Sequence, residues 1–146
     1  MTPTRRTILL AGAAALAAPT IRTAQGQGRV TLRLGHLANE QNVWHRASLH
    51  LAEQARALSN GRIEVQVFPN ETLGREMDVI NGMQLGTADM TITGESLQNW
   101  APLASLLAVP YAVTSIQQMD GVASGAIGQQ ISAEIITRAR VRPLGY

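Results

Sequence analysis

The sequence predicts an α/β fold in which a parallel-rich sheet is flanked by helices. Two segments with strand-like alternation of apolar residues, 30–35 and 62–68, stand on either side of a segment, 40–58, with helical apolar spacing. A second helical segment begins near residue 70 and leads to a third alternating segment, 88–93. This order of strands and helices favours parallel strands joined by right-handed helical crossovers.

Composition limits the size and the chemistry of the molecule. With 146 residues the chain forms at most one ordinary domain, which is long enough to bury a core. The absence of cysteine excludes disulfides and thiolate chemistry. All twelve basic residues are arginines, and because Arg5, Arg6 and Arg22 precede residue 27, nine arginines face ten acids in the rest of the chain. This balance argues against nucleic-acid binding, and no pattern indicates a metal or a cofactor.

The segment 1–26 is typical of an export signal, which leaves 27–146 as the mature chain. Arg5 and Arg6 precede an apolar run, 8–18, and small residues at 24–26 suit a cleavage site. The run is shorter than the ~20 residues of a membrane-spanning helix, so we expect no membrane insertion once the signal is removed. The paired arginines resemble a twin-arginine signal for export by the Tat route, and a Sec signal is the alternative.

The first strand and the first helix are both predicted from apolar spacing. Val30, Leu32 and Leu34 alternate with polar residues, and the strand ends at Gly35 and His36. A helix should follow from about Glu40 and end at 59–61, where Gly61 suits the left-handed cap position. The apolar face of this helix is predicted to consist of Trp44, Ala47, Leu51, Ala55 and Leu58.

The clearest strand-helix-strand unit covers residues 68–95. It begins at the end of a strand, 62–68, whose alternation places Ile63, Val65 and Val67 on one face and which Pro69 stops. Asn70 and Thr72 are candidate caps of the next helix, and Gly86 should end it. Helical spacing relates Leu73, Met77 and Ile80, and Gly82, inside the same predicted helix, is expected to allow close packing.

The second half of the chain is apolar but interrupted. Pro102 and Pro110 divide the run 100–113 into pieces too short to span a membrane, so we expect a buried short helix and a turn. Thr114 or Ser115 should cap another short helix. A longer helix should follow it and end near Arg138 and Arg140. Its apolar face would consist of Ile127, Ile131 and Ile135. The last segment, 141–146, is predicted to begin a strand.

Catalytic arrangements are scarce in this sequence. Ser96 follows a predicted strand as a hydrolase nucleophile would, but its turn lacks the second glycine and all three histidines precede it. His45 and His50 are five residues apart in the predicted helix, so they face different directions and are expected to be solvated surface residues. His36 is expected to have a structural role. We therefore expect no catalytic group and no metal site.

The loops after the predicted strands are the natural place for a ligand. In parallel α/β sheets ligands bind at the carboxyl ends of the strands. Residues 68–70 and 93–95 would both lie at that edge.

Several segments, in this order, resemble the amino-terminal half of a periplasmic solute-binding protein of a TRAP transporter, of the DctP family. The resemblance rests chiefly on SNGRIEVQVFPNETLG (59–74) followed by GMQLGTADMT (82–91), and it continues through Val109-Pro110-Tyr111 to the final Pro143-Leu144-Gly145-Tyr146. It covers essentially all of the mature chain.

This resemblance implies a periplasmic-binding-protein-like fold of two lobes, with most of the first lobe in this chain. It implies a periplasmic receptor, not an enzyme, that closes on a carboxylate-bearing organic acid and delivers it to the permease subunits of a membrane transporter. The arginine that anchors the carboxylate in this family would lie beyond residue 146, so the fragment alone should bind poorly. Positions that match the first-lobe wall of the cleft are Leu37, Ala38, Trp44, Thr93, Gly94 and Glu95, although Trp44 could instead anchor its helix.

Two other classes fit parts of the pattern. A small periplasmic hydrolase would need a base for Ser96 that the histidine order does not supply. A flavodoxin-like or response-regulator domain shares the alternation of strands and helices but would have no export signal.

Overall fold

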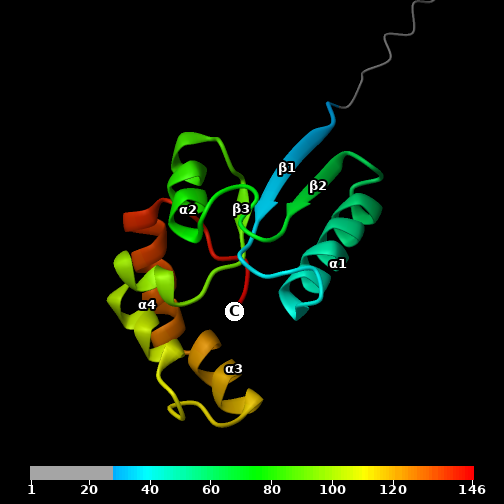
Figure 1. Ribbon diagram of the computed structural model, residues 1–146. Coiled ribbons are helices and arrows are strands. Elements are labelled where there is room, and N and C mark those ends of the chain that lie inside the picture. The colour runs from blue at the N-terminus through cyan, green and yellow to red at the C-terminus, as the bar shows by residue number, and fades with distance from the viewer. Residues whose placement is uncertain (1–27) are drawn as a thin grey trace, which may run out of the picture.

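A computed structural model describes residues 28–146, and its centre is a three-stranded parallel sheet in the order β2-β1-β3 (Figure 1). β1 (Val30–Gly35) pairs along its whole length with β2 (Ile63–Phe68). β3 (Met90–Thr91) pairs with only Leu34 and Gly35 of β1. The predicted parallel sheet is confirmed. The third strand is shorter than the predicted 88–93 because β1 ends at Gly35 and offers no partner to later residues.

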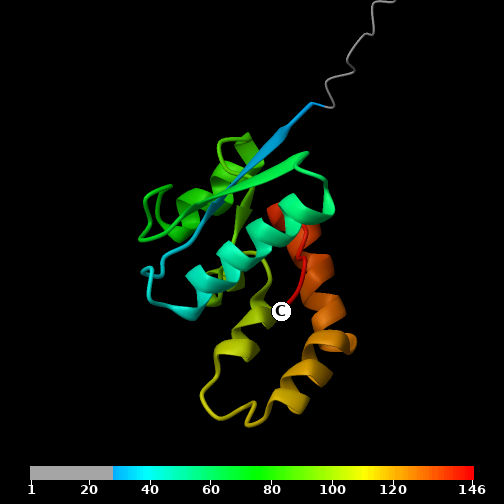
Figure 2. The ribbon, with the colours of Figure 1, turned by 90° about the vertical axis from the view of Figure 1, so that its right-hand side faces the viewer.

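Two helices lie on opposite faces of this sheet. α1 (Val43–Leu58) connects β1 to β2, and α2 (Glu76–Leu85) connects β2 to β3. The connection through α1 leads from β1 to β2 on one side of it, and the connection through α2 leads back across β1 to β3 on its other side. Because the two crossovers run in opposite directions and both are right-handed, their helices lie on different faces of the sheet. Figures 1 and 2 show α1 and α2 on either side of the strands.

α1 differs from the prediction in its start and in its buried face. The side-chain oxygen of Asn42 accepts a hydrogen bond from the backbone N–H of Trp44 at 2.9 Å, so the helix begins at Val43 rather than near Glu40. Ser48 is fully buried, whereas Leu51 and Leu58 are 40% and 83% exposed. The predicted apolar face was only partly right: Trp44 and Ala55 are half-buried, but Ser48 takes the innermost position and the two leucines are exposed.

α2 begins later than expected because the chain first makes a left-handed turn. Asn70 and Glu71 have φ angles of 54° and 57°, so neither begins a helix, and the predicted caps Asn70 and Thr72 were wrong. The helix instead starts after Arg75, whose backbone N–H donates to the Asp78 carboxylate at 3.2 Å. Gly86, in the left-handed conformation at φ 78°, ends the helix as predicted.

Gly82 is buried inside α2, and its packing explains why a side chain is missing there. A Cβ atom at this position would lie 2.7 Å from Thr87 Oγ1 and 3.5 Å from the Ala88 side chain. The predicted close packing at Gly82 is confirmed.

The second half of the chain forms a group of helices with its own core. Its elements are η1 (Glu95–Asn99), η2 (Pro102–Ala108), α3 (Ile116–Ser124), α4 (Ala126–Glu134) and the π-helix η3 (Ile135–Ala139). Ile131 and Ile135 pack against Ala101, Ala104 and Ala139 in a fully buried cluster. Ser115 caps α3 by accepting from the Gln118 N–H at 3.2 Å, as predicted.

Three expectations for this half were incomplete or wrong. Only Ala101 and Ala104 of the run 100–113 are buried, and Tyr111 at its end is 92% exposed with a left-handed φ of 62°. Ile127 is exposed, although Ile131 and Ile135 on the same predicted face are buried. Residues 141–146 form no strand, since no described strand pairs with them. The Tyr146 hydroxyl instead bonds with Ser132 Oγ of α4 at 2.7 Å.

Among residues 28–146, no helix is both long enough and apolar enough to cross a membrane. The predicted export signal, 1–26, lies outside the described residues.

An ion pair holds β1 to the start of β3. Arg33 Nε donates to Asp89 Oδ2 at 2.9 Å, the Arg33 backbone N–H donates to the same oxygen at 2.8 Å, and the Arg33 guanidinium also donates to the Gly86 carbonyl at 2.7 Å. The side chains are partly exposed, at 36% for Arg33 and 27% for Asp89. The hydrogen bond from Arg33 is the main reason that the pKa of Asp89 lies below its usual value, and partial burial opposes it.

Replacing Asp89 with Asn should lower the free energy of unfolding at neutral pH by about 1–2 kcal/mol, a range that discounts a charge-assisted hydrogen bond for partial exposure. A matched control is Glu64→Gln, which removes the more exposed Arg29–Glu64 pair of 3.1 Å and should change stability by less than about 1 kcal/mol. Urea unfolding at pH 7 measures both variants. Equal losses in the two variants would contradict a special role for Asp89.

The same pair predicts a pH dependence with a definite sign. Because the pKa of Asp89 is lowered by folding, the unfolded chain binds more protons than the folded chain below about pH 4. The contribution of the Arg33–Asp89 pair to the free energy of unfolding is therefore fully present above pH 4. It is lost as the pH falls through the lowered pKa of Asp89. The stability difference between the wild type and Asp89→Asn should shrink on going from pH 7 to pH 3, and a constant difference would refute the assignment.

Candidate functional site

The carboxyl ends of the three strands and the amino end of α2 meet at one edge of the sheet. The Glu71 N–H donates to the His36 carbonyl at 3.1 Å, and the Asn70 N–H donates to the Ala38 carbonyl at 3.0 Å, so the loops after β1 and β2 are joined. Glu76, the first residue of α2, joins the third loop by accepting from the Gly94 N–H at 3.1 Å and from the Ser96 hydroxyl. The edge at which ligands bind in parallel sheets is therefore one connected surface.

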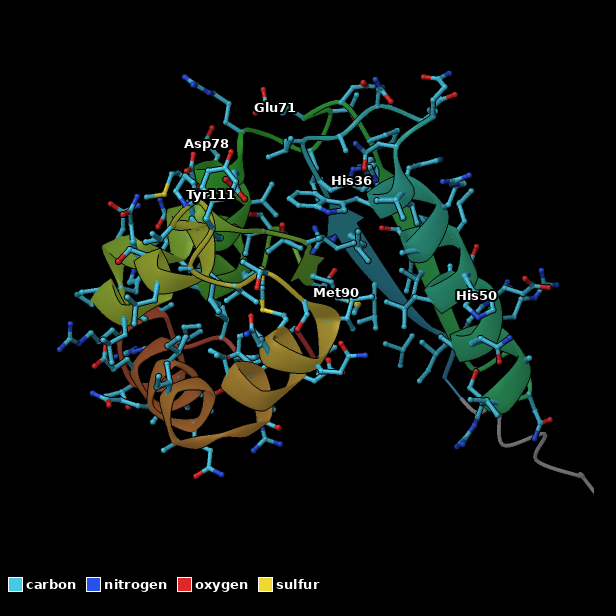
Figure 3. All side chains as sticks on the ribbon, turned by 90° about the horizontal axis from the view of Figure 1, so that it is seen from below. His36, His50, Glu71, Asp78, Met90 and Tyr111 are labelled. Atoms are coloured by element: carbon cyan, nitrogen blue, oxygen red, sulfur yellow. The ribbon has the colours of Figure 1, made fainter. Side chains whose placement is uncertain are left out.

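A pocket of about 350 Å³ opens at this edge, and we call it the edge pocket. It is bounded by the loop after β1, the loop after β2, the first turn of α2 and the start of η1. The lining residues are Leu37, Glu71, Arg75, Glu76, Met77, Asp78 and Ser96. Figure 3 shows Glu71 and Asp78 on the same side of the molecule, with His36 deeper between the sheet and α1.

The charges of the edge pocket determine which groups it suits. Three carboxylates, those of Glu71, Glu76 and Asp78, face a single guanidinium, that of Arg75. Ionised carboxylates only accept hydrogen bonds, so they match hydroxyl donors and repel a carboxylate brought near them. This lobe edge therefore suits the hydroxyl groups of a ligand better than its acid group.

A second, apolar cavity of about 440 Å³ lies below the edge, between α1, β3 and the last residues of the chain. Its wall includes Leu34, Trp44, Leu51, Met83, Thr93 and Tyr146. Thr93 Oγ1 is buried and has no hydrogen-bond partner among the described residues. One hydroxyl is thus left unsatisfied in a mainly apolar wall, which costs about 1–3 kcal/mol unless another group reaches it.

The six site residues predicted from the sequence divide between these two places. Leu37 lines the edge pocket, and Gly94 lies beside it through its bond to Glu76. Trp44 and Thr93 line the apolar cavity. Glu95 is exposed at the start of η1, and Ala38 is buried with its carbonyl bonded to Asn70.

Three of the histidine and serine expectations can be checked at this edge. His36 is 3% exposed and structural, as expected. His45 was expected to be solvated, and this was wrong: it is half-buried and its Nδ1 lies 3.2 Å from His36 Nε2. Ser96 donates its hydroxyl to the Glu76 carboxylate, so in this structure it is a structural tie between η1 and α2.

The sequence reasoning missed the acidic residues of the edge pocket. Glu71 and Glu76 were not singled out, although Glu76 is an acid placed a few residues after a strand end, where a helix begins. Such a position is a usable signal, because a first-turn carboxylate points back toward the preceding loops. It was hidden by the wrong assignment of the helix start to residue 70.

The parallel sheet and the helices that flank it define this chain as part of an α/β lobe. The model of the DctP family, bacterial extracellular solute-binding protein family 7, matches residues 34–146, and the chain belongs to this family. The named relatives are solute-binding proteins rather than enzymes, which removes the hydrolase alternative, and membership of the family removes the flavodoxin-like one.

A solute-binding protein of Roseobacter denitrificans is 65% identical over 117 residues, which are 80% of this chain and 36% of that protein. Its crystal structure, a TRAP periplasmic solute-binding protein with bound L-galactonate, superposes with a TM-score of 0.75 over 80% of this chain and 39% of that one. This chain thus spans little more than a third of the length of that relative.

Two further solved structures are similar to the chain. A TRAP periplasmic solute-binding protein of Bradyrhizobium in complex with D-galacturonate is 30% identical, with a TM-score of 0.70 over 80% of this chain and 39% of that one. One of Haemophilus influenzae with bound L-gulonate is 27% identical, with a TM-score of 0.65 over 74% of this chain and 36% of that one. The expected fold, one part of a two-lobe binding protein, is confirmed.

Replacing Glu76 with Ala should release the loop that follows β3. The backbone N–H of Gly94 and the hydroxyl of Ser96 both lose their acceptor, so exchange of the Gly94 amide should accelerate by about tenfold, the equivalent of one hydrogen bond. Gln84→Ala, at an exposed position of the same helix, serves as the control and should leave Gly94 exchange unchanged. Amide exchange followed by NMR measures both, and equal rates in Glu76→Ala and wild type would contradict the tie.

Proposed function

We propose that this chain forms part of the first lobe of a periplasmic receptor that binds a sugar acid and delivers it to a TRAP membrane permease. The ligands named for the three similar structures, L-galactonate, D-galacturonate and L-gulonate, each carry one carboxylate and several hydroxyl groups. The closeness to the Roseobacter receptor favours an aldonate such as L-galactonate as the first ligand to test.

The observation that supports this proposal most is the acidic edge pocket. Glu71, Glu76 and Asp78 can accept hydrogen bonds from ligand hydroxyls, and they oppose a carboxylate at the same place. The acid group of the ligand would therefore be held away from them, by an arginine of the second lobe that lies beyond residue 146. A guanidinium suits that role because it binds a carboxylate through two parallel hydrogen bonds.

Closure of two lobes would complete the site. Each lobe would replace part of the water around the ligand, the first through carboxylate and backbone groups and the second through the arginine. Leu37, Trp44, Thr93, Gly94 and Glu95 remain the proposed first-lobe contacts, joined now by Glu71 and Glu76. The buried carbonyl of Ala38 acts through the loop that it holds.

A chimera tests the proposed ligand. The aligned 117-residue region of the Roseobacter receptor is replaced with the matching region of this chain, and L-galactonate binding is measured by calorimetry at pH 7. We expect an affinity within about tenfold of the Roseobacter parent, a difference of about 1.4 kcal/mol. A folded chimera that binds no L-galactonate would contradict the assignment of this ligand. The chain of 146 residues by itself should show no binding at micromolar concentration, because it offers the acceptors without the arginine.

Export is proposed to use the segment 1–26, with the Tat route favoured by the paired arginines Arg5 and Arg6. Fusing residues 1–30 to a periplasmic reporter should give export that is lost when both arginines are replaced with lysine. A fusion that is exported equally well with lysines would exclude Tat and favour Sec.

A further inference from the structure

His36 and His45 form a hydrogen-bonded pair directly behind the edge pocket. His36 Nε2 and His45 Nδ1 are 3.2 Å apart, and their rings are tilted by 54° with centroids 5.4 Å apart. Figure 3 shows His36 between the sheet and α1, whereas His50 of the same helix is exposed. The pair therefore joins the first turn of α1 to the loop that follows β1.

The loop that this pair holds also carries proposed ligand contacts. His36 donates its backbone N–H to the Phe68 carbonyl at 3.1 Å and accepts from the Glu71 N–H at 3.1 Å. Leu37, its neighbour in the chain, lines the edge pocket together with Glu71. A displacement of His36 would therefore move residues of two loops at the ligand edge.

The hydrogen bond between the rings requires at least one of them to be neutral. One ring must donate and the other must accept, and if both rings carried two protons, two N–H groups would face each other. The remaining nitrogen of His36, Nδ1, is buried without a hydrogen-bond partner among the described residues, so burial disfavours a charge on this ring. Protonation of His36 while His45 is also charged would place two N–H groups face to face and push the two rings apart.

The charges around His36 act in the same direction. Burial is the main cause of its lowered pKa, and the charge of His45 is the second. The backbone of Ala38 opposes both weakly without reaching full hydrogen-bond geometry. Glu71, from the loop after β2, bonds to His36 only through its backbone N–H, and the Glu71 side chain is exposed. Among the described residues, His45 of α1 is the one titratable side chain whose charge lowers the pKa of His36.

We propose that the His36–His45 hydrogen bond positions the ligand edge of this lobe and makes it sensitive to acid. Both histidines are positioning residues, because they act through the loop that carries Leu37 and not through the ligand. Folding lowers the proton affinity of His36, so the folded edge is favoured above about pH 6.5 and is lost as the pH falls below that value. The effect on ligand binding rests on the proposed function, whereas the effect on the edge itself does not.

Two variants of His45 separate the charge of this residue from its hydrogen bond. In His45→Asn the amide occupies the place of the ring Nδ1, so it can donate to neutral His36 or, after rotation, accept from protonated His36. In His45→Ala the hydrogen bond is lost altogether. His50→Gln on the exposed side of the same helix is the control for removal of one helical histidine.

The first measurement is the NMR titration of His36 in the ligand-free chain. The pKa of His36 should rise toward the ordinary value in His45→Asn, because the repulsion from His45 is removed, and should remain below it, because burial persists. In His50→Gln it should not change. An identical titration of His36 in the wild type and His45→Asn would overturn the proposal.

The second measurement is amide exchange at the ligand edge, expressed as protection factors. In the wild type, the Asn70 and Glu71 amides should be protected at pH 7. As His36 becomes protonated, their protection factors should fall about tenfold for each pH unit. His45→Asn should keep the protection at pH 7 and lose less of it in acid, whereas His45→Ala should be poorly protected at both. Equal protection in His45→Ala and His50→Gln would refute the positioning role.

The chimera with the Roseobacter receptor extends the test to ligand binding. L-Galactonate affinity should fall about tenfold between pH 7 and pH 5, and clearly less in the His45→Asn chimera. The ligand carboxylate has an ordinary pKa near 4 and stays ionised over this range. Equal losses in the two chimeras would refute the acid sensitivity of binding. A chimera that binds at no pH would contradict the proposed function, while titration and exchange would still decide the role of the pair.

Discussion

The fold depends on the pairing of one central strand with two parallel neighbours. β1 offers β2 a full-length edge, but its opposite edge is used only at Leu34 and Gly35, where β3 pairs with it. Because all three strands run the same way, each must be followed by a connection that returns along a face of the sheet. The loops after the three strands therefore gather at one edge, and everything proposed for ligand binding follows from that arrangement.

Sequence periodicity was sufficient for the strands of this sheet and insufficient for the helix faces. Alternation placed β1 and β2 at their correct ends, since only one register buries Leu34 and Val65. In α1 the same reasoning failed, because Leu51 and Leu58 were read as the buried stripe while Ser48 takes the innermost position. Hydrophobic spacing identifies an apolar face of a helix, but it does not say which neighbour covers that face.

Local geometry at the candidate site was also beyond the reach of residue patterns. Two consecutive left-handed residues, Asn70 and Glu71, delay α2 until Glu76 and bring a carboxylate to the loop after β3. The hydrogen bond between His36 and His45 joins residues from a strand end and a helix, and nothing in their spacing indicates it. The order of strands and helices predicted which edge of the sheet to examine, whereas the acids that line it required the structure.

The two cavities of this lobe have different electrostatic characters, and this difference is informative. The edge pocket is rich in carboxylates, whereas the cavity below it is mainly apolar and has Thr93, with a buried and unsatisfied hydroxyl, in its wall. A ligand with an acid group at one end and hydroxyls along its length can donate hydrogen bonds to carboxylates through its hydroxyls, but its acid group must lie away from them. In the proposed function, opposite ends of such a ligand would lie against different protein surfaces, so this lobe would select the ligand without holding its charge.

The exposed leucines of α1 have a thermodynamic consequence. Leu58 keeps most of its surface in water in the folded state, and Leu85 and Ile116 on other helices do the same. Unfolding therefore exposes less new apolar surface than it would in a closed domain of equal length. The heat-capacity change and the denaturant slope both scale with that newly exposed surface, so this lobe should melt over a broad range of temperature and of urea concentration.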